Sequence, residues 1–159
     1  MNEPQLIARW VWLLFIAVTF ANALILKFRA QSYIRQQPEL AAGYQQLFRG
    51  VLFWGNLPWV VMGIGIVFGG VPNILSYFRP RDGNPFVLAW FGTVITIYLL
   101  GFYWLFARHG AEFLAEHAGL LRGGIKSPKA IRLYYCLMVA GGVAGMCVMF
   151  LIDFPGPVK

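Results

Sequence analysis

Four long apolar runs, separated by polar segments, constrain the fold of this chain more than any other feature. Within these runs, Asp, Glu, Lys, Arg and His are absent from every middle portion. A helix needs about 20 apolar residues to cross the hydrocarbon core of a bilayer, and the runs are close to that length. We therefore predict an all-α integral membrane protein, a four-helix bundle forming one domain over residues 1–159. The predicted transmembrane helices cover residues 10–26, 51–69, 86–107 and 133–152.

The composition supports a bilayer as the solvent. Hydrophobic residues make up 59% of the 159 residues and charged residues 12%, against about 25% charged residues in a typical soluble domain. A soluble fold this apolar would expose large hydrophobic patches. The net charge of +7 comes from basic residues scattered at the edges of the apolar runs. We expect these residues to face lipid headgroups and set topology, with no nucleic-acid partner.

The first apolar run has a competing interpretation as a cleaved signal peptide. Ala21-Asn22-Ala23 resembles a small-residue cleavage site. However, the run remains apolar as far as Leu26, and the segment before it carries Glu3 and a single basic residue, Arg9. We therefore expect the first span to be retained.

Amphipathic patterns occupy the first and third loops. Residues 27–37 contain no Gly or Pro, so the first helix should continue until Pro38 ends it. From Leu40 to Val51, apolar residues recur at helical spacing with polar residues opposite. A similar mixed pattern covers residues 111–121, with His117 on the apolar side. We predict interfacial amphipathic helices in both loops.

The segment between the second and third runs is dense in turn signals. Pro58 should kink the second helix, because proline removes one backbone hydrogen bond. Residues 73–78 should form a short interfacial piece with Tyr77 at headgroup level. Asp82-Gly83 then predicts a turn into the third span. In the third loop, Ser127-Pro128 is typical of a helix start, with serine as the N-cap.

Small residues recur at four-residue spacing inside three of the runs. Gly65 and Gly69 form a GxxxG pair in the second run, and Gly141 and Gly145 form another in the fourth. Gly92 precedes Thr96 by four residues in the third run. Such faces let helix backbones approach closely. We expect the second and fourth spans to pack against each other, or against the same spans of a neighbouring copy.

The distribution of basic residues predicts the orientation in a cell membrane. Loops 1 and 3 should be cytoplasmic, with both termini outside, because positive residues concentrate on the cytoplasmic side. Nine basic residues fall on the side of loops 1 and 3: Lys27, Arg29, Arg35, Arg49, Arg108, Arg122, Lys126, Lys129 and Arg132. Four fall on the other side: Arg9, Arg79, Arg81 and Lys159.

Polar amides within the spans offer one candidate binding site. Asn56 lies between Trp54 and Trp59, and Trp90 lies in the following span. Indole rings could enclose a lipid, quinone or pigment, with the amide as its polar contact. The alternative is a hydrogen bond between helices that fixes their pairing, which we favour for both Asn56 and Asn22.

Two residue sets carry possible metal ligands. His109, Glu112 and Glu116 share one side of a predicted helix and could hold zinc or iron. We favour a solvated polar face, because a single exposed helix rarely completes a coordination sphere. Soft ligands for Cu(I) occur in the last run, where we interpret the methionines as packing residues. This second set is Met138, Met146 and Met149 with Cys136 and Cys147.

The sequence contains no nucleophile–base motif, phosphate-binding loop or HExxH pattern. Our first hypothesis is therefore a non-catalytic protein without a cofactor: an accessory or assembly subunit of a membrane complex, or a homo-oligomeric scaffold packed through small-residue faces. The second is a binding module for a lipophilic ligand between spans 2 and 3. The third is a passive channel or uncoupled carrier, because titratable groups that could couple transport are missing from the spans.

Overall fold

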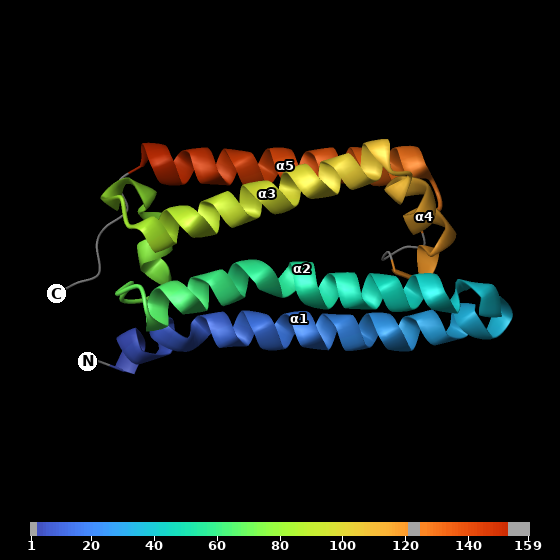
Figure 1. Ribbon diagram of the computed structural model, residues 1–159, viewed down its shortest axis with the longest axis horizontal. Helices are drawn as coiled ribbons and strands as arrows, with labels where there is room; N and C mark the ends of the chain where they lie inside the picture. The colour runs from blue at the N-terminus through green and yellow to red at the C-terminus, as the bar shows by residue number, and fades with distance from the viewer. Residues whose placement is uncertain (1–2, 121–124, 153–159) are drawn as a thin grey trace.

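The computed structural model of the chain describes residues 3–120 and 125–152, and these residues are mostly helical, with no strand among them (Figure 1). The all-α prediction is confirmed for them. Short 3-10 turns, labelled η, connect the α-helices. In chain order the elements are α1 (Glu3–Gln36), η1 (Pro38–Leu40), α2 (Ala41–Val67), η2 (Ile74–Phe78), η3 (Pro80–Asp82), α3 (Pro85–Ala107), α4 (Gly110–Glu116), η4 (Ala118–Leu120) and α5 (Pro128–Leu151).

Four of these helices are long and apolar enough to cross a membrane, over residues 7–36, 38–67, 85–107 and 128–151. Each apolar run identified in the sequence falls on one of them to within two residues. Figure 1 shows that α1 begins and α5 ends at one end of the molecule, while α4 and the α1–α2 connection lie at the other. Loops 1 and 3 therefore share an end.

Loop 1 is formed by the continuation of α1 and by the first turns of α2. Residues 27–36 extend α1, and residues 41–50 form the first turns of α2, so no separate interfacial helix lies between them. The break is confined to Gln37, whose backbone is extended (φ −138°, ψ 84°), and to η1. Pro38 explains this geometry, because proline disfavours the helical conformation in the residue before it.

The connection from α2 to α3 is held by local side-chain hydrogen bonds. The Asn73 Oδ1 atom accepts a 2.9 Å bond from the Leu75 N–H, and the Asn84 Oδ1 atom accepts one of the same length from the Phe86 N–H. Gly83 takes a left-handed conformation (φ 70°) directly after η3. The Asp82-Gly83 turn is confirmed, and so is the start of α5, where the Ser127 side chain caps the helix before Pro128.

The side chain of Tyr77 in η2 points inward against α2, and its position at headgroup level stays a prediction. It is only 2% exposed, and its hydroxyl donates a 3.0 Å hydrogen bond to the Met62 carbonyl in α2. The ring fits because Gly65 has no side chain: a Cβ there would collide with the Tyr77 hydroxyl. Burial raises the pKa of Tyr77 to about 12, so the hydroxyl remains a donor at neutral pH.

The long helices form two pairs, called hairpins below: α1 with α2, and α3 with α5. Helix α3 also packs against α2, and this contact is more extensive than its contact with α5. Phe86 at the start of α3 lies over Gly69 of α2. Figure 1 shows α3 running away from α2 toward the α4 end. The larger buried cluster lies where α2, η2 and the start of α3 meet, which we call the closed end: Met62, Ile66, Val71, Tyr77, Val87 and Phe91. A second buried cluster, at the α4 end, consists of Leu105, Ala111 and Ile131.

Replacing Gly65 with Ala should destabilise the protein by disturbing this closed end. The new Cβ would collide with the Tyr77 hydroxyl and lie 3.0 Å from the Phe86 Cβ. Overpacking of a core costs about 1–3 kcal/mol, whereas alanine gains about 1 kcal/mol over glycine inside a helix. Thermal unfolding of the purified protein in detergent should therefore begin at a lower temperature for G65A than for the parent.

Gly92 provides the matched control, because it lies in α3 and a Cβ there would meet no atom within 4 Å. G92A should unfold at the parent's temperature or above it. If both variants unfolded at the parent's temperature, the packing of Tyr77 on Gly65 would be contradicted.

Candidate functional site

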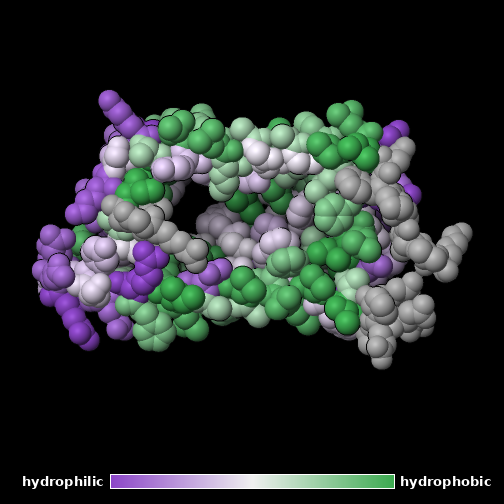
Figure 2. Space-filling view, turned by 180° about the vertical axis from the view of Figure 1, so that it is seen from behind, coloured by the Kyte–Doolittle hydropathy of each residue, from purple (hydrophilic) through white to green (hydrophobic). Residues whose placement is uncertain are grey.

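A lateral opening separates the two hairpins near the α4 end. Figure 2 shows it passing between the two helical layers, with both hydrophilic and hydrophobic residues on its rims. On α2, residues 48, 55, 62 and 69 share nearly one side of the helix, because seven residues make almost two turns. Along this line Met62 is buried and Gly69 lies under Phe86, but Gly55 is exposed. The single atom within 4 Å of a Cβ at Gly55 belongs to Thr19 of α1, so this position faces α1.

The facing line on α3 consists of Trp90, Ile97 and Trp104, again at seven-residue spacing. Trp90 packs against the core at the closed end. Trp104 packs beneath α4, with its indole over Gly110 and its ring centroid 6.2 Å from that of Phe113. Ile97 lies midway between them and is partly exposed. We call the space that Figure 2 shows between the two helical layers the interhairpin opening.

The structure brings together two of the four residues suggested for a lipophilic ligand. Trp59 and Trp90 both pack against the core between the hairpins, and Trp59 also stacks on Phe15 of α1 with centroids 4.3 Å apart. Trp54 is 45% exposed and lies edge-on to its neighbour Phe53. It therefore lies away from the core that the other two indoles share.

Asn56 is buried, and its side chain makes one local hydrogen bond. Its Nδ2 atom donates a 2.8 Å bond to the Leu52 carbonyl one turn earlier. Its Oδ1 atom is buried without a hydrogen-bond partner in the described part of the chain, and the same holds for the indole N–H groups of Trp12 and Trp90. Asn22 is exposed. Neither amide makes a hydrogen bond between helices in the described residues, so that prediction stays open.

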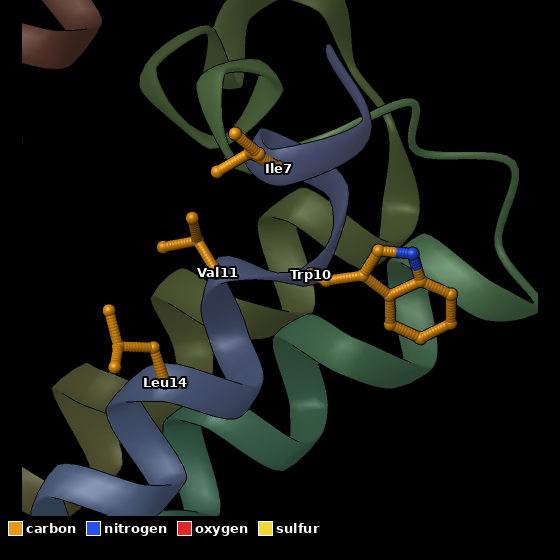
Figure 3. Close-up of a pocket in the computed structure, with 4 residues that line it drawn as sticks. All are labelled: Ile7, Trp10, Val11 and Leu14. Carbon is orange, nitrogen blue, oxygen red and sulfur yellow. The ribbon is translucent and has the colours of Figure 1, made fainter. Parts of the chain in front are cut away.

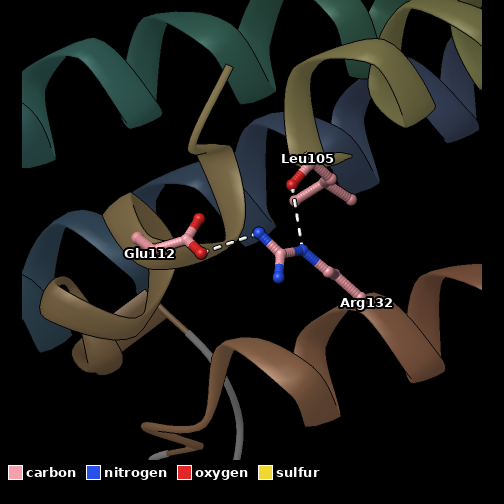
Figure 4. Close-up of polar contacts among 3 residues, drawn as sticks. All are labelled: Leu105, Glu112 and Arg132. Atoms are coloured by element: carbon pink, nitrogen blue, oxygen red, sulfur yellow. Dashed lines mark hydrogen bonds and ion pairs between the residues drawn. The ribbon is translucent and has the colours of Figure 1, made fainter. Parts of the chain in front are cut away.

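Residues 109–116 serve a structural role in the described part of the chain. Figure 4 shows Arg132 reaching from α5 to Leu105 at the end of α3 and to Glu112 in α4. Arg132 donates a 2.7 Å hydrogen bond to Glu112 and a 3.3 Å bond to the Leu105 carbonyl. The pKa of Glu112 is lowered, first by a hydrogen bond from its own backbone N–H and then by Arg132. The ionised carboxylate thus joins α4 to α5.

The remaining candidate metal ligands are not assembled around Glu112. His109 precedes α4 with a left-handed backbone (φ 55°), and both His109 and Glu116 are exposed. Among the described residues, no group of three His, Cys, Asp or Glu side chains is placed to hold a metal ion. Cys136 and Cys147 are both free and exposed on α5.

A buried histidine, which the sequence analysis did not select as a site, connects the third loop to α2. His117 is 3% exposed, and its Nδ1 atom lies 2.8 Å from the Phe113 carbonyl. Its ring meets Tyr44 edge-on at 4.9 Å and lies directly against Gly43, where a Cβ would collide with Nε2. The Gly119 N–H donates a 3.2 Å bond to the Tyr44 hydroxyl. The only available signal was the position of His117 on the apolar side of its segment.

The candidate packing glycines fall into two groups. A Cβ at Gly65 or Gly69 would collide with Tyr77 or Phe86, so this GxxxG pair is filled within the chain by η2 and α3. A Cβ at Gly92, Gly141 or Gly145 would meet nothing within 4 Å. The second GxxxG pair is therefore open in the described structure.

A shallow depression of about 370 Å³ lies on α1 and is lined by Ile7, Trp10, Val11 and Leu14. Figure 3 shows Ile7, Val11 and Leu14 projecting to one side of the helix and Trp10 to the other. Apart from the indole N–H, these side chains offer no polar group, so the depression has no groups that could perform chemistry.

The four long apolar helices are consistent with a multi-pass membrane protein. Comparisons with protein families, curated proteins and solved structures gave no match to this chain. Function is therefore argued from the geometry above.

Replacing Gly43 with Ala should loosen the third loop, because the new methyl group would displace the His117 ring from α2. Hydrogen exchange of the backbone amides of residues 117–119 should become faster, since the Gly119–Tyr44 hydrogen bond depends on the same contact. Gly50→Ala is the control within α2, because a Cβ at Gly50 meets nothing within 4 Å. Unchanged exchange in G43A would contradict the contact.

Replacing Glu112 with Gln should lower the thermal stability at neutral pH but not in acid. The pKa of Glu112 is below its ordinary value of 4.5 in the folded protein, so the ionised carboxylate stabilises folding above that pH. This contribution is lost as the pH falls through the lowered folded-state pKa. Melting temperatures of parent and E112Q should converge on acidification, whereas the exposed Glu116→Gln variant should track the parent. A constant gap between parent and E112Q would count against an ionic contact.

Proposed function

We propose that the protein is a non-catalytic membrane scaffold that self-associates through α5. The observation that carries this proposal is the open Gly141–Gly145 pair, which contrasts with the filled Gly65–Gly69 pair in α2. Small residues at four-residue spacing gain little packing stabilisation when they face acyl chains. They do let two helices approach closely enough for backbone contact. An open pair on a helix therefore supports a helix partner outside the chain.

The contacts of α5 within the chain use a different side of the helix. The Tyr98 hydroxyl of α3 lies over Gly142, and the Tyr135 hydroxyl donates a 2.6 Å bond to the Tyr98 carbonyl. Gly142 and Tyr135 lie about 100–120° around the helix from Gly141, at 3.6 residues per turn. The Gly141 side is thus free while α5 remains packed on α3.

A second copy of the same chain is the occupant that the geometry favours. A small-residue face is complementary to another such face, and a two-fold axis along α5 would place the two faces together. The alternative is an accessory or assembly subunit that binds a different membrane protein through the same side of α5. Both arrangements use no catalytic group, in keeping with the structural roles of Glu112, Arg132 and His117 described above.

Disulfide cross-linking in native membranes tests the self-association. Val148 lies seven residues after Gly141 and hence on the same side of α5. In a background with Cys136→Ser and Cys147→Ser, Val148→Cys should give a cross-linked product of twice the chain mass. The native cysteines lie roughly 120–140° around the helix from Gly141, so the parent should cross-link poorly.

Adding Gly141→Ile and Gly145→Ile should reduce the cross-linked fraction about tenfold, because their side chains would hold the helices apart. Gly92→Ile, at an open glycine on α3, is the matched control and should leave the product unchanged. A product of another mass would favour the accessory-subunit alternative over self-association. No product from Val148→Cys, or no effect of the isoleucines, would overturn the α5 interface.

A further inference from the structure

We infer that His117 acts as a pH-sensitive latch between the two hairpins, closed while its imidazole is neutral and released when the imidazole is protonated. The latch lies in the third loop, away from the open glycine pair of α5, and does not depend on the proposed self-association. The inference rests on the position of His117, on the burial of its ring, and on one ring nitrogen without a hydrogen-bond partner.

The third loop is attached to both hairpins. On one side, Arg132 of α5 holds α4 through Glu112. On the other side, η4 packs against α1, and the Gly119 N–H donates its hydrogen bond to the Tyr44 hydroxyl of α2. His117 lies between these two attachments, at the end of α4 and directly before η4. Movement of its ring away from α2 would therefore loosen the link between the third loop and the α1–α2 hairpin.

The hydrogen bond of Nδ1 determines which nitrogen carries the hydrogen in the neutral ring. A carbonyl oxygen only accepts hydrogen bonds, so Nδ1, which lies 2.8 Å from the Phe113 carbonyl, must be the donor. Nε2 is then the unprotonated nitrogen. In the described part of the chain it is buried and has no hydrogen-bond partner. Protonation of the ring would therefore place the new N–H group at Nε2.

The surroundings of Nε2 provide no acceptor for that N–H group. A Cβ at Gly43 would collide with Nε2 before any other atom of the ring, so this nitrogen points at the α2 backbone. A charged donor that is buried without an acceptor costs more than a neutral acceptor that is buried without a donor. In water, both N–H groups of an imidazolium find acceptors. Protonation therefore favours a ring that has left its contact with α2.

In the described part of the chain, no carboxylate pairs with the ring. The charged and titratable side chains on the elements around it are Arg29 and Tyr33 on α1, Glu39 on η1, Tyr44 on α2, and Glu112 and Glu116 on α4. Tyrosine hydroxyls are uncharged in mildly acidic solution, and an arginine would only repel a second cation. Glu39 and Glu116 are exposed, and Glu112 is paired with Arg132.

Two features of the site favour a cation and act against release. The ring centroids of Phe113 and Tyr44 lie 4.4 Å and 4.9 Å from that of the imidazole, and aromatic rings attract cations. The C-terminal end of α4 has an effect of the same sign, although α4 has only seven residues. Neither feature gives Nε2 an acceptor, because this nitrogen points at Gly43. The missing hydrogen bond therefore sets the direction, and acid should release the latch.

Hydrogen exchange of the full-length protein in detergent measures the latch. The protection of the Gly119 amide, corrected for the intrinsic pH dependence of exchange, should fall about tenfold between about pH 7.5 and about pH 5.5, where histidine changes charge. The Leu75 amide at the closed end, which is bonded to Asn73, should keep its protection and so exclude global unfolding. Glu112 stays ionised over this range, because its pKa is lowered from its ordinary value of 4.5.

The chain contains two histidines, which allows a matched comparison. His117→Asn retains an amide donor for the Phe113 carbonyl but cannot be protonated, so its Gly119 protection should not depend on pH. His117→Phe keeps a neutral ring and is the second variant if asparagine does not hold the loop at neutral pH. His109→Asn is the control, because His109 is exposed and asparagine tolerates its left-handed backbone. H109N should respond to pH as the parent does.

Three results would overturn the inference. The first is constant Gly119 protection in the parent across this pH range. The second is loss of the response in H109N, which would assign it to the exposed histidine. The third is an undiminished response in a His117 variant that is protected at neutral pH. If neither His117 variant is protected at neutral pH, a response retained by H109N supports the latch, since His117 is then the only histidine in the chain.

Discussion

The Tyr77 ring is inserted against α2 at the start of the connection to α3, and the spacing of the two hairpins depends on this contact. A buried hydroxyl needs a hydrogen-bond acceptor, and the Met62 carbonyl provides it at 3.0 Å. The bond requires the ring to reach the backbone of α2, which only the absence of a side chain at Gly65 allows. The connection is thereby fixed to α2, and Phe86 starts α3 directly over Gly69. Among the described residues, no hydrogen bond joins α2 to α3 farther from this connection, and Figure 1 shows α3 diverging from α2 toward the α4 end.

The two GxxxG pairs show how one sequence motif can have two different structural uses. Gly65 and Gly69 accept aromatic side chains from η2 and α3, so their contribution is to the fold of a single chain. Gly141 and Gly145 have the same spacing in an equally apolar helix, yet nothing within the described chain fills them. The difference arises from the neighbouring segments. Helix α2 is followed by η2, whose Tyr77 packs on Gly65, whereas α5 meets α3 through Gly142 and Tyr135.

Sequence patterns within short segments predicted the helix positions, helix ends and turns, because interactions between neighbouring residues determine these features. The apolar runs located the four long helices, Pro38 ended α1, and the cap at Ser127 and the turn at Gly83 followed from their residue types. The contacts that build the candidate sites join residues far apart in the chain. The inward position of Tyr77, the Arg132–Glu112 pair and the seat of His117 on Gly43 each require the distance between two helices. The spacing of residues along one helix does not predict the distance between two helices.

The interhairpin opening and the open face of α5 have a common physical origin. In water, the hydrophobic effect would drive the two hairpins together, but acyl chains solvate apolar side chains about as well as other side chains do. Helices in a bilayer therefore pack closely only where shape or a polar bond gives a specific gain, as at Gly65 and Arg132. Where neither exists, an empty gap would forfeit dispersion contacts on both walls. Acyl chains or a second helix backbone from outside the chain would restore such contacts.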